Sequence, residues 1–483
     1  MLKQLFRNSF YLALPQLLTQ AVSFFLMPLY MARLSPSDYG VMELLNICAT
    51  VLMIIVTLQI SQAIIRFTID SKDEHEEKVI ISTGFWSSFI SIFTTFSILL
   101  LFSQTFNQWL TESKEYLTVY ILFAFSFLIN GVSGYMATLL IWQKKVKQSA
   151  ISSGISIILT VGLSIWLILF MDKGIVGSYI AIVCSSAISL LVNYYFVKDK
   201  IKFSLSKGKY LEMIRFSTPL VFSALAWYSW YFIDRFMLRS FLSLHELGLF
   251  SVAAKFAIIF GVVLSVIESS FFPIVLSNYK DEKSPQKIAE FFSIVLTGIL
   301  FLYCGINFFA KDIFNFLSSG EFNEAWRLLP LICLGQIFIK IYFFMPGFAI
   351  KRKTIYILYL SLAGTAVNIL FNFLLISRYG LQGAAIATSL GAFFFLVAYA
   401  FISLKLYPIP FNWFKIILCA VIAGLLTALC YFLQLRYNAD TFFLRMLLFC
   451  LTIGIALFVL IGRQRLLQYM GGLSLALQRK RAG

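Results

Sequence analysis

Charged residues are scarce in this sequence of 483 amino acids, and their scarcity excludes a soluble fold. Only 13% of the residues are Asp, Glu, Lys or Arg, while 60% are hydrophobic. In soluble domains about a quarter of all positions carry a charge. A chain with so few charges is typical of an integral membrane protein.

Histidine and cysteine are too few and too dispersed to form a metal or nucleophile site. His75 and His245 lie in polar breaks far from any cysteine cluster, and the seven cysteines fall in apolar segments without Cys-x-x-Cys spacing. Metal centres and His-based nucleophiles need such residues in groups. We therefore predict no metal, no cofactor and no catalytic residue, and expect the protein not to be an enzyme.

Long polar segments are also absent, since no break between apolar stretches exceeds about twenty residues. This leaves no room for a folded domain outside the membrane. Apolar stretches long enough to cross a bilayer recur along the whole chain. We predict an all-α integral membrane fold with fourteen transmembrane helices, at residues 10–32, 41–65, 79–103, 116–142, 149–171, 174–197, 211–234, 248–272, 289–310, 327–350, 354–376, 380–404, 413–434 and 443–462.

The positive charges of the loops predict the orientation. With a cytoplasmic N-terminus, 26 Lys and Arg residues fall on the inner side and 9 on the outer side. Lys and Arg are retained on the cytoplasmic side of membrane proteins. We expect both termini to be cytoplasmic, the first apolar run to be a retained span, and the net charge of +17 to reflect topology and anionic lipids without nucleic acid.

An internal repeat divides the chain. Residues 174–181 (GIVGSYIA) and 380–387 (GLQGAAIA) match at an offset of 206. Within two residues of that offset, Pro15 matches Pro219, Gly40 matches Gly248, and the basic turn at 143–145 matches 351–353. Six predicted helices per copy make the repeat parallel, which is a transporter architecture.

The repeat sets the predicted domains: a first lobe at 1–205, a second lobe at 206–405, and an added helix pair with a basic cytoplasmic tail at 406–483. Two facing lobes predict a central cleft that opens to each side of the membrane in turn.

Two segments resemble a known family. Residues 32–41 (ARLSPSDYGV) and 368–388 (NILFNFLLISRYGLQGAAIAT) are similar to polysaccharide transport proteins, the Wzx-type oligosaccharide flippases of the multidrug/oligosaccharidyl-lipid/polysaccharide (MOP) exporter superfamily. The added C-terminal pair resembles that of the lipid II flippases of the same superfamily, where it helps to form a groove for the lipid tail.

The resemblance implies a flippase that moves a polyprenyl-pyrophosphate-linked oligosaccharide from the inner to the outer leaflet of the bacterial cytoplasmic membrane. The product would serve a surface polysaccharide such as capsule or the O-antigen of lipopolysaccharide. The partners would be this lipid-linked saccharide, membrane lipids, and a polysaccharide polymerase or other assembly proteins. An anionic pyrophosphate needs a water-filled, cationic cleft to pass through hydrocarbon.

Charges inside spans are the first candidates for the cleft, because they are costly in a bilayer. Lys255 lies inside the eighth predicted helix and Lys340 near the middle of the tenth. Either they bind pyrophosphate as point charges, or they pair structurally with Glu268 or another acid within a lobe.

Arginines and aromatic residues at helix ends form a second candidate set. Arg33 and Arg239 follow the first and seventh helices, and Arg66 ends the second on the inner side. They can receive or release pyrophosphate at the two mouths of the cleft, or only anchor the helices at the interface. Trp227, Trp230 and Tyr231 belong to an aromatic run that either forms an interfacial belt or stacks on sugar rings.

Acids and prolines complete the predicted site. Glu43, Asp234 and Glu268 are candidates for coupling transport to H⁺ or Na⁺, although Asp234 adjoins Arg235 and can form a structural ion pair with it. Pro15 and Pro219 are candidate hinges, or else static kinks.

Two other functions stay open. A cation-coupled multidrug exporter of the same superfamily is disfavoured because the first helix contains no acid, whereas many such exporters have one there. A membrane oligosaccharide polymerase or glycosyltransferase is disfavoured because such enzymes usually need a long external loop.

Overall fold

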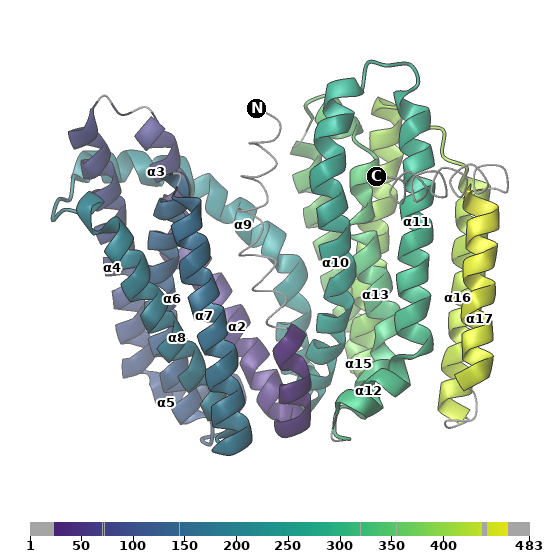
Figure 1. Cartoon of the computed structure of the whole chain (residues 1–483), viewed down its shortest axis with the longest axis horizontal. Coiled ribbons are helices and arrows are strands. Elements are labelled where there is room, and N and C mark those ends of the chain that lie inside the picture. The colour runs from purple at the N-terminus through teal and green to yellow at the C-terminus, as the bar shows by residue number, and fades with distance from the viewer. Residues whose placement is uncertain are drawn as a thin grey trace, which may run out of the picture. The chain divides into compact units, whose positions relative to one another are not determined.

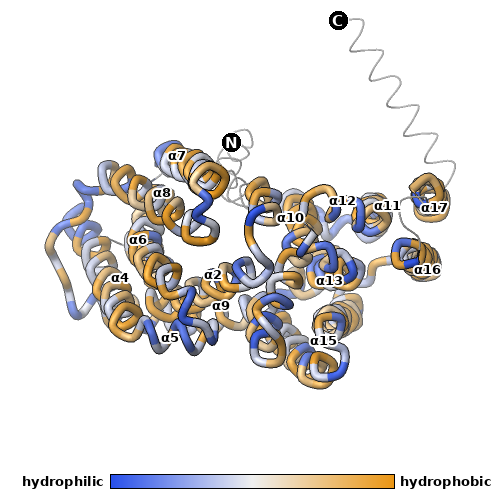
Figure 2. The backbone as a smooth tube through the Cα atoms, turned by 90° about the horizontal axis from the view of Figure 1, so that it is seen from below, coloured by the Kyte–Doolittle hydropathy of each residue, from blue (hydrophilic) through white to orange (hydrophobic). Residues whose placement is uncertain are grey.

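The computed structural model describes residues 24–461, apart from residues 70, 72, 144, 319, 354 and 437–441. Helices and short connections make up these residues, and no strand occurs among them. Contacts divide the chain into two units, residues 1–251 and 252–483. Figure 2 shows that hydrophobic residues dominate the helices of both units.

The first unit is built from helices that run side by side (Figure 1). After a helical stretch at 24–33 come α2 (Pro36–Val56), α3 (Ile60–Ile69), α4 (Glu74–Leu101), α5 (Ser103–Thr111), α6 (Leu117–Trp142), α7 (Val146–Ile165) with a π-turn at Trp166–Phe170, α8 (Gly174–Val197) with a short turn at Lys198–Lys200, α9 (Lys207–Phe241), and the start of α10 (Leu244–Asn278). The repeat assigns α9 to the second lobe, yet α9 packs within this unit on α2, α3 and α4.

Among its described residues, the second unit contains the rest of α10 and seven further α-helices. These are α11 (Ser284–Phe308), α12 (Ala310–Leu317), α13 (Leu329–Phe338), α14 (Gly347–Ile350), α15 (Ile355–Leu406), α16 (Trp413–Arg436) and α17 (Phe442–Ala456). Short 3-10 turns at Asn323–Leu328 and Ile341–Phe344 flank α13, and a π-turn at Leu457–Ile461 follows α17.

Eleven segments of the described chain are long and apolar enough to cross a membrane. They account for twelve of the fourteen predicted spans, because 355–406 contains two predicted spans that meet at Gly380, where the backbone is not helical. The seventh predicted span falls in α9, which is not among the eleven, and the first lies mostly outside the described residues. A multi-pass, all-helical membrane fold is thus confirmed.

The start of α2 explains one of the sequence motifs. Ser35 caps the helix by accepting a hydrogen bond from the Asp38 amide at 3.1 Å, and the Asp38 carboxylate accepts one from the Ser35 amide at 3.1 Å. Pro36 occupies the first helical turn, where its missing amide proton costs nothing. The Ser-Pro-Ser-Asp sequence is therefore a capping box that fixes where α2 begins.

Two predicted spans are broken in the structure. The span at 41–65 is interrupted between α2 and α3, where Leu58 and Gln59 have positive φ angles of 50° and 53°. The span at 327–350 is interrupted between α13 and α14, with Lys340 at the break and Pro346 just before α14. Hydropathy cannot detect such breaks, because the residues around them are as apolar as those of a continuous helix.

The basic connection between α8 and α9 is bonded to the first half of α4. The amide of Lys202 donates to Ser82 Oγ at 2.8 Å, and Trp86 donates to the Lys202 carbonyl at 2.9 Å. Lys209 Nζ lies 2.7 Å from Glu76 Oε1, and this hydrogen bond raises the pKa of Lys209. The connection between α8 and α9 is thereby held on α4.

The added helices α16 and α17 are joined to the second unit by buried polar contacts, which we call the helix-pair clasp. Arg445 of α17 donates to the Phe308 carbonyl at 2.9 Å and pairs with Asp312. Gln434 of α16 donates to the carbonyls of Asn307 and Phe308, both at 3.1 Å. The clasp satisfies carbonyls at the junction of α11 and α12, where the helix ends.

Candidate functional site

A polar groove of about 580 Å³ lies within the first unit, and we call it the unit 1 groove. Its walls come from α2, α3, α4, α6, α8, α9 and the break between α2 and α3. Uncharged polar side chains supply much of the lining: Asn46, Thr50, Thr57, Gln59, Ser61, Ser88, Ser126, Asn130 and Thr138. Aromatic side chains supply another part: Phe123, Phe127, Tyr135, Tyr179 and Tyr228. No described residue that lines this groove carries a charge.

The helix break contributes directly to the groove. Thr57, Gln59 and Ser61 line it, and Gln59 is held in a left-handed conformation that non-glycine residues rarely adopt. Such strained positions cost about 1–3 kcal/mol and cluster at functional sites. Irregular backbone at membrane depth is tolerated where it lines a water-filled cavity.

Several polar groups in the groove keep a hydrogen-bond donor or acceptor available for a ligand. Thr50 and Thr138 donate their hydroxyl protons to helix carbonyls at 2.9 Å, so their oxygens are available as acceptors. Asn130 accepts a hydrogen bond from Ser186 Oγ at 2.9 Å, which leaves its amide NH₂ to donate. Acceptors, amide donors and aromatic faces together suit an uncharged ligand rich in hydroxyl groups.

A buried ion pair joins α2 and α9, two of the helices that line the groove. Arg235 of α9 is 8% exposed, and its Nε lies 3.9 Å from Glu43 Oε1 of α2. The guanidinium also lies over the ring of Phe250, 5.4 Å from its centroid. The neighbouring Asp234 is 1% exposed. The sequence had suggested Asp234 as the partner of Arg235, and the structure adds Glu43 from another helix.

The predicted aromatic residues of α9 lie in different environments. Tyr228, which the sequence analysis did not select, lines the groove. Tyr231 is half-buried, with its ring centroid 6.5 Å from that of Tyr228, and Trp230 is buried at 8% exposure. The side chain of Trp227 lies outside the described residues.

The predicted arginines are spread along the first unit. Arg33 ends the helical stretch before α2 and is exposed. Arg239 is held by Glu112, 2.8 Å away, and its Nε donates to the Leu110 carbonyl at 2.8 Å. Arg66 is exposed in the last turn of α3.

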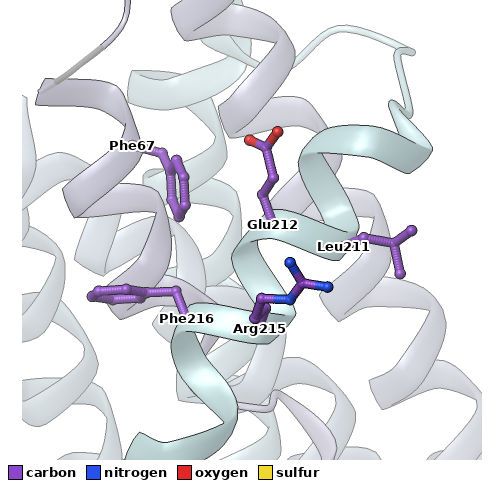
Figure 3. Close-up of a pocket in the computed structure, with 5 residues that line it drawn as sticks. All are labelled: Phe67, Leu211, Glu212, Arg215 and Phe216. Atoms are coloured by element: carbon purple, nitrogen blue, oxygen red, sulfur yellow. The ribbon is translucent and has the colours of Figure 1, made fainter.

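A second cavity of about 430 Å³ lies between the end of α3 and the first turns of α9 (Figure 3). Phe67 of α3 and Phe216 of α9 form one side of it, with their ring centroids 6.0 Å apart. Arg215 and Glu212 of α9 supply its charged groups.

In the second unit, the structure brings together two of the predicted charges. Lys340 at the break after α13 acts electrostatically on Glu268 of α10, and both side chains are half-buried. Lys255 lies thirteen residues before Glu268 in α10, which corresponds to roughly 20 Å along a helix. Lys255 therefore cannot pair with Glu268, whereas Lys340 can.

The remaining predictions concern hinges and metals. Pro219 lies inside α9, and Pro15 lies outside the described residues. Within residues 24–461 and outside the gaps, no group of three or more His, Cys, Asp or Glu side chains is placed to hold a metal ion.

Comparison with known sequences identifies the family. The profile of the family described as polysaccharide biosynthesis protein matches residues 5–280. The capsular polysaccharide biosynthesis protein CapF of Staphylococcus aureus is 26% identical over 228 residues, 46% of this chain and 58% of that protein. The probable low-salt glycan biosynthesis flippase Agl15 of Haloferax volcanii is 23% identical over 257 residues, 50% of this chain and 52% of that protein. The chain thus spans little more than half the length of these relatives.

Comparison with solved structures supports the fold. The lipid II flippase MurJ in its inward closed conformation matches 92% of this chain and 98% of its own, with a TM-score of 0.71 and 16% identity. An inward-facing multidrug resistance MATE family transporter of the MOP superfamily matches 82% of this chain and 97% of its own, with a TM-score of 0.59 and 15% identity. Because the family profile covers more than half of the 483 residues, the chain belongs to the family described as polysaccharide biosynthesis protein, as its motifs predicted.

Proposed function

We propose that this protein is a flippase that moves a polyprenyl-pyrophosphate-linked oligosaccharide from the inner to the outer leaflet of the bacterial cytoplasmic membrane by alternating access. Membership of the polysaccharide biosynthesis family supports the substrate class. The observation that carries the proposal is the unit 1 groove, whose lining combines uncharged polar and aromatic side chains. Sugars are bound by this combination, because their hydroxyl groups form hydrogen bonds and their apolar faces stack on aromatic rings.

The same lining argues against export of cationic drugs. A carboxylate close by is the strongest compensation for the hydration that a cation loses when it leaves water. The described lining residues of the groove include neither Asp nor Glu. A saccharide headgroup therefore suits this groove better than an organic cation, and we propose transport rather than an enzymatic reaction.

Other parts of the proposal rest on the charged residues. We propose that four cationic residues contribute positive potential along the path of the pyrophosphate: Lys255, Arg33, Arg66 and Arg239. Glu268, together with Lys340, is the candidate site for coupling to H⁺ or Na⁺. Pro219 is the candidate hinge in α9. The expected partners are the lipid-linked saccharide, bilayer lipids and a polysaccharide polymerase.

The test is transport by the purified protein in phospholipid vesicles. Lipid-linked oligosaccharides of defined composition are placed in one leaflet, and their appearance in the other is measured with a lectin or a glycosidase that cannot cross the membrane. Parallel vesicles carry a proton gradient, a Na⁺ gradient or neither. Protein-dependent movement of a lipid-linked saccharide supports the proposal. Export of an organic cation dye without saccharide movement would instead favour a multidrug exporter.

Tyr228 provides a variant that tests the groove in the same assay. Tyr228→Phe retains the aromatic face and Tyr228→Ala removes it. We expect Tyr228→Phe to transport nearly as well as the natural protein, and Tyr228→Ala to transport about two- to twelvefold more slowly, the equivalent of about 0.5–1.5 kcal/mol. Equal activity of the two variants would remove Tyr228 from the saccharide site.

A further inference from the structure

Arg235 is a buried cation without a hydrogen-bond partner at its Nε. The residue is 8% exposed, and Nε is a buried donor that no group in the described part of the chain accepts. Buried polar groups in proteins are nearly always hydrogen-bonded, and an unsatisfied one calls for an explanation. A buried donor that no described protein group uses is suited to an incoming acceptor.

Glu43 balances the charge of Arg235 without binding it tightly. The 3.9 Å from Arg235 Nε to Glu43 Oε1 is within the range of an ion pair but beyond that of a hydrogen bond. Arg and carboxylate groups that bind each other fully do so through two short parallel hydrogen bonds. This pair lacks such bonds, so a better-placed oxyanion can replace Glu43 at the guanidinium.

The pair continues the walls of the unit 1 groove. On α9, Arg235 follows the groove residue Tyr228 by seven positions, which is about two helical turns and returns to the same face. On α2, Glu43 precedes the groove residue Asn46 by three positions, also on the same face. Tyr179, which lines the groove, is within electrostatic reach of Glu43. The ion pair therefore lies where the uncharged lining of the groove ends.

We propose that Arg235 is an oxyanion-binding site at this end of the groove and that Glu43 is a resident counter-ion, which the ligand's anionic group displaces. The proposal rests on the proposed function, since it assumes that the groove holds a saccharide. The shared chemistry is an oxyanion attached to a sugar. It comes either from the pyrophosphate that links sugar to lipid or from the carboxylate of an acidic sugar.

Arginine suits this role better than lysine would. Its planar guanidinium presents a fork of donors that matches two oxygens of a phosphate or carboxylate. It also stacks on aromatic rings, as Arg235 does on Phe250. The Phe250 ring leaves the guanidinium edge as the part that binds an anion.

Binding to the full-length protein in phosphatidylcholine nanodiscs tests the proposal, with calorimetry as the readout. Farnesyl pyrophosphate provides a phosphate without a sugar, methyl glucuronide a carboxylate sugar without a phosphate, and farnesol and methyl glucoside are the neutral counterparts. We expect one anionic probe to bind more tightly than its neutral counterpart, which identifies the source of the oxyanion. Arg235→Gln should weaken that binding about tenfold or more, because it removes a charged hydrogen bond.

Glu43→Gln separates a binding role from a structural one. If Glu43 competes with the ligand, its neutralisation should strengthen binding of the anionic probe roughly threefold or more. If the pair only stabilises the fold, Glu43→Gln should leave binding unchanged or weaken it. Should Arg235→Gln fail to fold, Arg235→Lys keeps the charge without the fork and should still weaken binding.

Matched controls come from an exposed ion pair in the second unit. Lys287 Nζ lies 3.0 Å from Asp281 Oδ2, and both side chains are largely exposed. Lys287→Gln and Asp281→Asn make the same charge changes and should leave binding unaltered. Equal affinity of the natural protein for charged and neutral probes, or unchanged affinity in Arg235→Gln, would overturn the anion site. Loss of the proposed function would show instead as absent vesicle transport with these binding effects intact.

Discussion

Gly40 of α2 and Gly248 of α10 lie against each other in the first unit, so closely that neither position has room for a side chain. A Cβ atom on Gly248 would lie 1.8 Å from the Pro36 carbonyl oxygen, and one on Gly40 would lie 2.3 Å from that of Leu244. The internal repeat matched the same two glycines. Repeat-related helix starts therefore meet backbone to backbone.

Alanine at either glycine should destabilise the protein. The atoms in the way belong to backbone carbonyls, which cannot move aside as a flexible side chain can. We expect Gly40→Ala and Gly248→Ala each to lower the free energy of unfolding by about 1–3 kcal/mol, measured by thermal denaturation in detergent. Gly162→Ala in α7 is the control, because nothing lies within 4 Å of its added methyl group. It should be neutral or slightly stabilising, and a Gly248→Ala variant as stable as this control would contradict the close contact.

Removal of an amide from the groove should reduce saccharide transport. Asn46 is an exposed residue of α2 in the groove lining. Asn46→Leu keeps the approximate volume and removes hydrogen bonds worth about 1 kcal/mol, so we expect a roughly fivefold loss of transport. Vesicle transport is the measurement. Gln104→Leu, an exposed amide of α5 outside the groove lining, should have normal activity. Equal losses of transport in Asn46→Leu and Gln104→Leu would mean that any exposed amide matters equally, which would contradict a specific role of the groove.

Glu268 and Lys340 should be energetically coupled. Lys340→Gln leaves the Glu268 carboxylate half-buried without that cation, and Glu268→Gln has the converse effect. We expect each single variant to be destabilised, and the double variant to be about 0.5–3 kcal/mol more stable than the sum of the two single effects, as measured in a thermal double-mutant cycle. If the two single effects on stability simply add in the double variant, Glu268 and Lys340 do not interact. Retention of ion-gradient-stimulated transport in Glu268→Gln would exclude Glu268 from coupling.

Disruption of the helix-pair clasp should loosen α16 and α17. Arg445 is 2% exposed, so Arg445→Gln withdraws a charged donor from the buried Phe308 carbonyl and from Asp312. The Asp312 side chain is 40% exposed and can be hydrated in the variant. We therefore expect the free energy of unfolding to fall by only about 1–3 kcal/mol. Thermal denaturation measures the effect. Lys287→Gln, at an exposed ion pair, should leave the unfolding temperature unchanged.

The spans were predictable because hydropathy is a property of the local sequence. The seventh was placed at 211–234, and α9 runs over Lys207–Phe241. That helix falls outside the eleven apolar segments, and it carries charges such as Arg215, Asp234 and Arg235. The breaks at Leu58–Gln59 and at Lys340 were not predictable, since they depend on backbone angles that only packing sets.

Charges inside the spans do not predict the groove, because no described residue of its lining is charged. Its residues are neutral, and a neutral polar residue in an apolar helix is a weak signal by itself. One signal was available: Ser126, Asn130, Gly134 and Thr138 follow each other at intervals of four in α6, and all line the groove. Residues four apart share one helix face, so this polar stripe predicts a helix side that does not face lipid.

The sequence by itself determined the membrane class, the positions of most spans, the repeat and the family, because each depends on local composition or on chain order. Only the tertiary structure placed Glu43 beside Arg235 and gathered Asn46, Asn130 and Tyr228 around one groove. These residues come from helices far apart in the chain, and their contacts follow from which helix faces pack together. Glycines such as Gly40 and Gly248 decide that packing, since their missing side chains allow two backbones to touch.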